Sequence, residues 1–118
     1  MDRAFAEAFA QEWIAAWNSH DLDRIFSHYT DDFEMCSPFI VERMNEPSGT
    51  LRGKPAIRPY WEWGLAADPP LHFELDQVLT GVESITICYR RTGKWSRAAE
   101  VLFFNGQGRV VRGVAHYG

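Results

Sequence analysis

Hydrophobic residues recur at three- and four-residue steps near the start of the chain, which is the spacing of an amphipathic helix. Over residues 3–18 the repeating positions are Phe5, Phe9, Trp13 and Trp17. Asp21 then fits the N-cap of a second helix. The apolar face of that helix would consist of Leu22, Ile25, Phe26 and Tyr29. We therefore expect two consecutive helices in this part of the chain.

The period changes to two in three later segments, which indicates strands. These segments are FEMCSP (33–38), LHFELDQVL (71–79) and SITICYRR (84–91). In the first of them, Phe33, Met35 and Ser37 share one side of the strand. Turn signals at Thr92-Gly93 and at residues 105–108 predict that two further strands follow.

Two segments between these elements carry helix breakers. Residues 38–52 contain two prolines, one glycine and several charges, so we expect a long loop there, a candidate lid over a site. Residues 54–67 should contain a third helix. Pro59 either occupies the first turn of a late-starting helix or bends an early one.

The predicted order of elements defines the fold class. It runs helix, helix, strand, helix and then four strands in succession. Consecutive strands form an antiparallel meander, and the helices gather on one of its faces, which is an α+β fold. The length of 118 residues fits a single domain over residues 1–118.

Composition and charge exclude several classes of protein. Hydrophobic residues make up 46% of the chain and aromatic residues 14%, enough for a folded core. The net charge is −4 with Lys and Arg scattered, so we expect no nucleic-acid partner. No apolar run reaches membrane-spanning length, and the N-terminus has no signal-peptide pattern. Cys36 and Cys88 lie in predicted strands, and we expect them to be free thiols and not a disulfide. Because free thiols are typical of reducing compartments, we expect a cytoplasmic protein.

Three blocks of the sequence together resemble a known superfamily. They are AAWNSHDLDRIFSHYTDDFEMCSP, GTLRGKPAIRPYWEWGL and VLFFNGQGRVVRGVAHYG. In this order they resemble the nuclear transport factor 2-like superfamily, in its SnoaL-like and ketosteroid-isomerase-like branch. The resemblance implies a cone-shaped, curved antiparallel sheet wrapped around about three helices, the cystatin-like or nuclear transport factor 2-like fold. It also implies an apolar pocket in the cone and a homodimer formed through the outer sheet face.

The resemblance also assigns roles to individual positions. Steroid isomerases of this branch use a carboxylate base at the end of the first strand, a tyrosine on the first helix and a protonated carboxylic acid on a late strand. In this chain those positions fall on Ser37, Trp13 and Glu100. Supporting tyrosine positions fall on Tyr29 and Trp61. Because serine is too weak an acid to replace the carboxylate and an indole is a poorer acid than a phenol, we expect no efficient steroid isomerisation.

Glu100 is the candidate catalytic residue. It interrupts an apolar strand, and an unrelieved buried carboxylate is costly. It shares strand parity with Ala98, Leu102 and Phe104, so it should face into the cone near Trp13, with a raised pKa. Two alternatives remain: an outward Glu100 paired with an arginine such as Arg97 or Arg112, or a structural acid satisfied by Trp13 or Tyr29.

The other polar candidates are weaker. Trp13 and Trp61, with Tyr29 and Ser37, are candidate ligand-binding residues. His116 should lie on the outer sheet face by parity. His72 and Glu74 share a strand face, but nothing else converges there, so we expect no metal site. No glycine-rich phosphate loop follows a strand, so we expect no nucleotide cofactor.

The function hypothesis is a small-molecule pocket protein of the SnoaL-like type. Its partner would be a small apolar molecule, with or without a carbonyl group, and Glu100 would support lyase, cyclase or isomerase chemistry if a reaction is catalysed. The alternative is a non-catalytic binding or protein-interaction module. The outer sheet face of the expected homodimer would consist of Cys88, Arg90, Ala99, Val101, Phe103, Val114 and His116.

Overall fold

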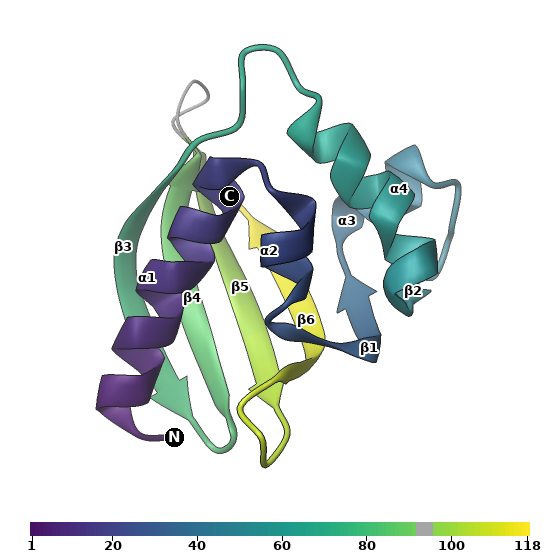
Figure 1. Cartoon of the computed structure of the whole chain (residues 1–118). Helices are drawn as coiled ribbons and strands as arrows, with labels where there is room; N and C mark the ends of the chain where they lie inside the picture. Colours follow the sequence, from purple (N-terminus) through teal and green to yellow (C-terminus); the bar gives the residue numbers. More distant parts are fainter. Residues whose placement is uncertain (92–95) are drawn as a thin grey trace.

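The computed structural model describes residues 1–91 and 96–118 (Figure 1). Over these residues it contains four helices and six strands. In chain order they are α1 (Arg3–Ser19), α2 (Leu22–Phe26), β1 (Tyr29–Cys36), α3 (Pro38–Arg43), β2 (Thr50–Arg52), α4 (Lys54–Leu65), β3 (Phe73–Gly81), β4 (Ser84–Arg91), β5 (Ser96–Phe104) and β6 (Val110–Tyr117). The α+β class is confirmed. The turn expected at Thr92-Gly93 lies outside the described residues.

The six strands form one sheet in the order β2-β1-β6-β5-β4-β3. The meander from β3 to β6 is antiparallel throughout, as predicted. The pairing of β1 with β6 is parallel, so the expectation of a purely antiparallel sheet is wrong for this pair. Because β1 and β6 are far apart in sequence, no hairpin forces them to run in opposite directions.

The two predicted N-terminal helices are present. Asp2 caps α1 by accepting a hydrogen bond from the backbone N–H of Phe5. Asp21 caps α2 as predicted and accepts from the N–H groups of Asp23 and Arg24. Tyr29 is not on the face of α2, as we expected, because α2 ends at Phe26 and Tyr29 begins β1, paired with Val110 of β6.

Residues 38–52 are not a long loop, which corrects the prediction for this segment. Ser37 caps α3, and Pro38 occupies the first turn, where its missing N–H costs nothing. The buried Ile40 anchors the helix to the core. Leu51 in β2 then pairs with Met35 in β1. Both short elements are therefore held by contacts with the rest of the fold.

Helix α4 resolves the ambiguity at Pro59. The helix begins early, at Lys54, and Pro59 lies inside it. The buried side of α4 presents Ile57, Tyr60 and Trp61 to the core. Among the residues that the structure describes, no helix is both long and apolar enough to cross a membrane.

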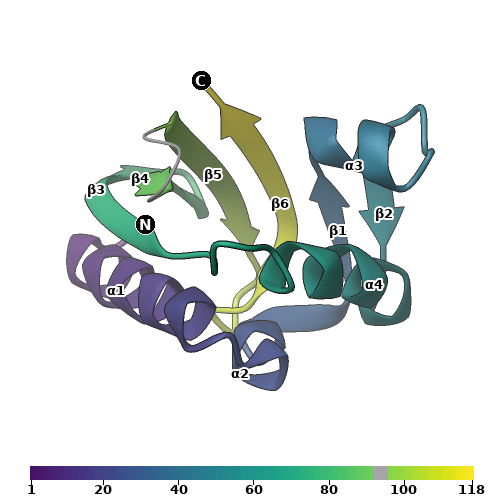
Figure 2. The same cartoon turned by 90° about the horizontal axis from the view of Figure 1, so that it is seen from above.

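The sheet curves around the helices, which lie along its concave side (Figure 2). Buried residues of β4 and β5 alternate with less buried ones, which fixes the inward face of the sheet. Glu100 lies on this inward face, opposite Ile87 of β4 and Ala115 of β6. The prediction that Glu100 lies on the inward side of β5 is therefore confirmed. The alternative in which Glu100 points outward and pairs with an arginine is wrong.

The opposite face of β5 and β6 leads to a prediction about assembly. Val101, Phe103 and Val114 are only partly buried there, and contiguous apolar surface of this kind usually marks an interface. We expect a two-fold symmetric dimer through this face. Sedimentation equilibrium at about 10 μM should give the dimer mass for the wild type and the monomer mass for Val101→Glu.

Leu79→Glu is a suitable control, because Leu79 is exposed on the edge strand β3. It should leave the dimer intact. A monomeric wild type at this concentration contradicts the prediction, as does a Val101→Glu variant that remains a dimer.

Candidate functional site

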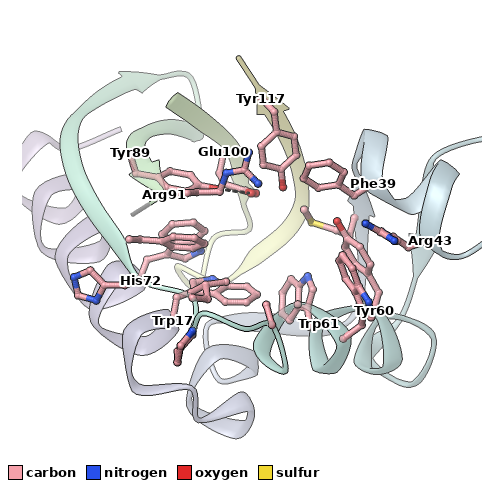
Figure 3. Close-up of a pocket in the computed structure, with 18 of the residues that line it drawn as sticks. Trp17, Phe39, Arg43, Tyr60, Trp61, His72, Tyr89, Arg91, Glu100 and Tyr117 are labelled. Carbon is pink, nitrogen blue, oxygen red and sulfur yellow. Dashed lines mark hydrogen bonds between the residues drawn. The ribbon is translucent and has the colours of Figure 1, made fainter. Parts of the chain in front are cut away.

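A cavity of about 300 Å³ lies on the concave side of the sheet. Helices α1, α3 and α4 contribute to its wall, together with strand β1, the start of β3, the middle of β5 and the last residues of β4 and β6 (Figure 3). Deep lining residues are Trp13, Trp17, Tyr29, Trp61, Phe73, Tyr89, Glu100 and Tyr117. The volume is at the lower end of the range of roughly 300–1,000 Å³ for small-molecule sites. The wall is thus largely aromatic, with one carboxyl group deep inside.

Glu100 is buried in this aromatic setting. Its exposed fraction is 5%, and within residues 1–91 and 96–118 no Arg, Lys or His forms an ion pair with it. The hydroxyl of Tyr89 donates a hydrogen bond to its Oε1 at 3.3 Å. The carboxyl group therefore has a neutral partner and no compensating charge.

This environment decides the protonation state of Glu100. Burial raises its pKa from the usual 4.5 to about 8, although the hydrogen bond from Tyr89 acts in the opposite direction. Glu100 is thus mainly a neutral carboxylic acid at pH 7. In that form it has one O–H group to donate.

The phenols around the cavity are also neutral. Burial is the main cause that raises the pKa values of Tyr29, Tyr89 and Tyr117, and the proximity of Glu100 raises them further. These hydroxyls therefore remain O–H donors across the physiological range. The inner end of the cavity consists of neutral hydrogen-bonding groups on an apolar wall.

Trp13 reaches Glu100 indirectly. Its indole N–H donates to the hydroxyl of Tyr29 at 2.9 Å, and its ring packs against the ring of Tyr89 with centroids 5.3 Å apart. Tyr89 in turn contacts Glu100. The alternative in which Trp13 or Tyr29 satisfies Glu100 is wrong, because the hydrogen-bond partner is Tyr89.

Ser37 lies outside the cavity wall. Its Oγ accepts from the N–H of Phe39 at 3.2 Å and from the hydroxyl of Tyr60 at 3.0 Å. It is buried behind Tyr60, which does line the cavity. The position that we matched by resemblance to the base of the steroid isomerases therefore holds a helix-capping serine. Trp61, by contrast, is buried in the cavity wall and packs edge-on against Trp17.

Sequence reasoning did not single out Tyr89 as a partner of Glu100. The alternation of strand β4 could have identified it, because Tyr89 lies on the same, inward-facing side of the strand as Ile85 and Ile87. Arg43 and Arg91 at the cavity were also missed, because neither interrupts an apolar pattern. His116 is exposed on the outer face, as its parity predicted. Within the described ranges, no three His, Cys, Asp or Glu side chains are grouped where they could hold a metal ion.

Comparison with known proteins defines the family. Residues 10–118 match the family model of the SnoaL-like domain, and the chain belongs to this family. A SnoaL-like protein of unknown function from Burkholderia thailandensis is 51% identical, with a TM-score of 0.94 over 99% of this chain and 97% of that chain. No curated protein gives a significant match to the sequence.

More distant structures share the fold. SalBIII, an epoxide hydrolase/cyclase-like enzyme in pyran ring formation in the polyether salinomycin, is 16% identical with a TM-score of 0.75, covering 99% of this chain and 93% of that one. A protein with a cystatin-like fold from Methylobium petroleophilum is 17% identical with a TM-score of 0.76, covering 100% and 78%. These likenesses confirm the cystatin-like, nuclear transport factor 2-like architecture.

The raised pKa of Glu100 predicts how stability depends on pH. Between pH 4.5 and 8 the folded chain holds a proton that the unfolded chain has released, so the free energy of unfolding falls as pH rises. The expected slope is about 1.4 kcal/mol per pH unit, and it flattens above the folded pKa. Urea unfolding of the wild type at half-unit pH steps measures it.

Glu100→Gln is the matched control, because it keeps the shape of the side chain but cannot ionise. Its free energy of unfolding should lack this component of the slope between pH 5 and 8. The same pH dependence in both proteins would show that Glu100 does not titrate as an elevated acid.

Proposed function

We propose that the cavity binds a small, largely apolar organic molecule, and that protonated Glu100 donates a hydrogen bond to an oxygen of that molecule, such as a carbonyl. The observation that carries the proposal is a buried carboxyl group, with no cationic partner among the described residues, on the wall of an aromatic cavity. Such a wall supplies apolar contact, and one donor inside it fixes the orientation of a ligand.

A count of protons supports a free donor at this point. Protonated Glu100 and Tyr89 together carry two hydroxyl protons, and they share one hydrogen bond. One group donates in that bond, so we propose that the proton of the other is directed to an oxygen of the ligand. An unsatisfied buried donor costs roughly 1–3 kcal/mol. A ligand oxygen would remove this cost, so the site favours molecules that carry an acceptor over pure hydrocarbons.

The same geometry limits the reactions that the site would support. A neutral carboxylic acid can protonate a leaving oxygen or polarise a carbonyl, and a well-placed general acid contributes ~10²–10⁴-fold. Removal of a proton from carbon needs a base, but Ser37 caps α3 outside the cavity wall. We therefore propose acid-assisted ring opening or cyclisation at an oxygen. Glu100 protonates the leaving oxygen as its C–O bond breaks, a hydroxyl of the ligand or a water forms the new C–O bond, and the proton released by that hydroxyl or water returns to the Glu100 carboxylate. SalBIII is described with ring-forming chemistry, but that likeness concerns the fold alone, so the assignment rests on Glu100.

The alternative is an interaction module with no ligand. A pocket filled by its own side chains would fit that role, whereas this chain keeps a cavity of about 300 Å³. Binding without chemistry is separated from catalysis by Glu100→Gln. That variant retains a hydrogen-bond donor but cannot transfer a proton, so it would keep ligand affinity and lose turnover.

A pair of model compounds tests the role of Glu100 in binding. Benzophenone and diphenylmethane have the same two rings, and the first adds a carbonyl group. We expect wild-type protein at pH 6.5 to bind benzophenone about fivefold more tightly, the value of one net hydrogen bond. The indole N–H signals of Trp13, Trp17 and Trp61 in a ¹⁵N-labelled sample report binding in the cavity.

Two variants make this experiment specific. Glu100→Gln should retain the preference for benzophenone, and Glu100→Leu should abolish it while diphenylmethane still binds. Raising the pH above 8 should weaken the preference in the wild type, because ionised Glu100 has no proton to donate. Equal affinities of the two compounds for the wild type refute the role of Glu100. If neither compound shifts the three indole signals at its solubility limit, the cavity is not a site for such ligands.

A further inference from the structure

We infer that the ligand of this cavity carries an anionic group, such as a carboxylate, and that Arg91, with support from Arg43, binds that group at the cavity. This inference rests on the proposed function, because it concerns the same cavity, and it adds the charge of the ligand. It is carried by the arrangement of arginines in the fold.

Most arginines in the described part of the chain are paired with carboxylates. Ion pairs with Asp or Glu are formed by Arg3, Arg24, Arg52, Arg58, Arg90 and Arg112. Arg43 and Arg91 both line the cavity, and neither has a carboxylate partner within the described residues. Residues 92–95 are Thr, Gly, Lys and Trp, so they contain no carboxylate that could pair with Arg91.

The guanidinium of Arg91 is held in place by neutral groups. Its Nε and Nη2 donate to Oγ of Ser96 at 3.2 and 2.8 Å. Its plane lies over the ring of Tyr117, 4.6 Å from the centroid, and near the ring of Phe39 at 5.5 Å. A guanidinium has five N–H donors, and three of those on Arg91 have no acceptor within residues 1–91 and 96–118 beyond the two bonds to Ser96. A stacked guanidinium with free donors is suited to bidentate recognition of a carboxylate.

Figure 3 shows where these groups lie. Arg91 is beside Glu100 and Tyr89 on one side of the cavity, and Arg43 is on the other side, beyond Phe39 and next to Tyr60. Arg43 stacks on Trp63 with 4.4 Å between its Cζ and the ring centroid. The two cations therefore flank the aromatic space. An anion bound by Arg91 would lie on the same side of the ligand as the oxygen that Glu100 contacts.

The charge balance of the cavity points in the same direction. The whole chain has a net charge of −4. The ionisable residues that line the cavity, apart from the tyrosines, are Arg43, Arg91, Asp68, His72 and Glu100. Among the Arg, Asp and Glu side chains of this set, with Glu100 protonated, two positive charges face one negative charge. The cavity is thus a positive region of a negative protein, and such a region attracts anions and raises their association rate.

Three compounds with one ring system, two of them neutral and one anionic, test the inference. Benzophenone, 4-benzoylbenzamide and 4-benzoylbenzoate share the ring system, and only the last is an anion at pH 6.5. We expect wild-type protein to bind the benzoate at least about tenfold more tightly than the benzamide, as expected for charge-assisted hydrogen bonds. Calorimetry gives the affinities, and the indole signals of Trp13, Trp17 and Trp61 confirm that each compound enters the cavity.

Variants identify the arginine that carries the preference. Arg91→Gln should reduce the preference for the benzoate to less than about threefold and leave the benzamide affinity nearly unchanged. Arg43→Gln should reduce it less. Arg109→Gln is the matched control, because Arg109 is an exposed arginine in the β5–β6 turn and does not line the cavity. It should have no effect on either compound.

A salt titration tests the same inference on the wild-type protein alone, so its result does not depend on whether the Arg91→Gln variant folds. Raising NaCl from 20 to 300 mM should weaken benzoate binding severalfold and leave benzamide binding unchanged, because salt screens charged contacts. Equal affinities of the benzoate and the benzamide overturn the inference and leave the proposed function standing. A preference that survives in Arg91→Gln overturns the role of Arg91. If none of the three compounds enters the cavity, both the inference and the proposed function fail.

Discussion

The burial of the Glu100 carboxyl in an aromatic cavity is the constraint on which the account of this site depends. A carboxylate without a cationic partner cannot remain ionised at low cost in such surroundings. Burial raises the pKa of Glu100 to about 8, and the side chain therefore holds its proton at pH 7. A glutamate side chain on the surface would be ionised at pH 7. Inside this fold, Glu100 is instead a neutral hydrogen-bond donor. In the proposed function, its pairing with Tyr89 leaves one proton for a ligand.

Two hydrogen bonds within the aromatic wall join polar groups to each other and not to Glu100, whereas the buried indole N–H of Trp17 has no partner among the described residues. The indole of Trp13 is bonded to Tyr29, and the hydroxyl of Tyr60 is bonded to Ser37. Neither bond gives Glu100 a second donor, so Tyr89 is its hydrogen-bond partner among the described residues. The rings of Trp13, Phe73 and Tyr89 pack with centroids 4.5–5.8 Å apart, which keeps the wall apolar. The positive charges of Arg43 and Arg91 lie on the cavity without forming an ion pair with the acid.

The elements predicted correctly from the sequence are those with a strong local signal. The spacing of Phe5, Phe9, Trp13 and Trp17 predicts α1 because every turn of that helix repeats the pattern. Alternation predicts that Glu100 faces inward, since its two-residue neighbours are apolar and buried. The short elements within residues 38–52 were missed even though Ser37 and Pro38 form a helix-start signal. The three-residue strand β2 pairs with β1, and the six-residue helix α3 contacts β2. No local pattern reveals these contacts.

The composition of the site was harder to predict than its position. Tyr89 and Glu100 meet because β4 and β5 pair with Ile87 opposite Glu100 and Tyr89 opposite Ala98, so the two side chains are diagonal neighbours on one face. That register is a property of the folded sheet. The stacking of Arg91 on Tyr117 likewise joins two strand ends that the sequence separates. Ser37 was matched to a catalytic position by resemblance, and its structural role follows from Tyr60, on a different element.

Infrared difference spectroscopy of the ligand-free protein tests the central claim, the protonated state of Glu100, most directly. The spectrum of the wild type minus that of Glu100→Gln should show the carbonyl stretch of one protonated carboxylic acid at pH 7. That band should give way to carboxylate bands with a midpoint near pH 8, the value set by burial. A difference spectrum that shows only carboxylate bands at pH 7 would contradict the account, because Glu100 would then be an ionised side chain with no proton to offer a ligand.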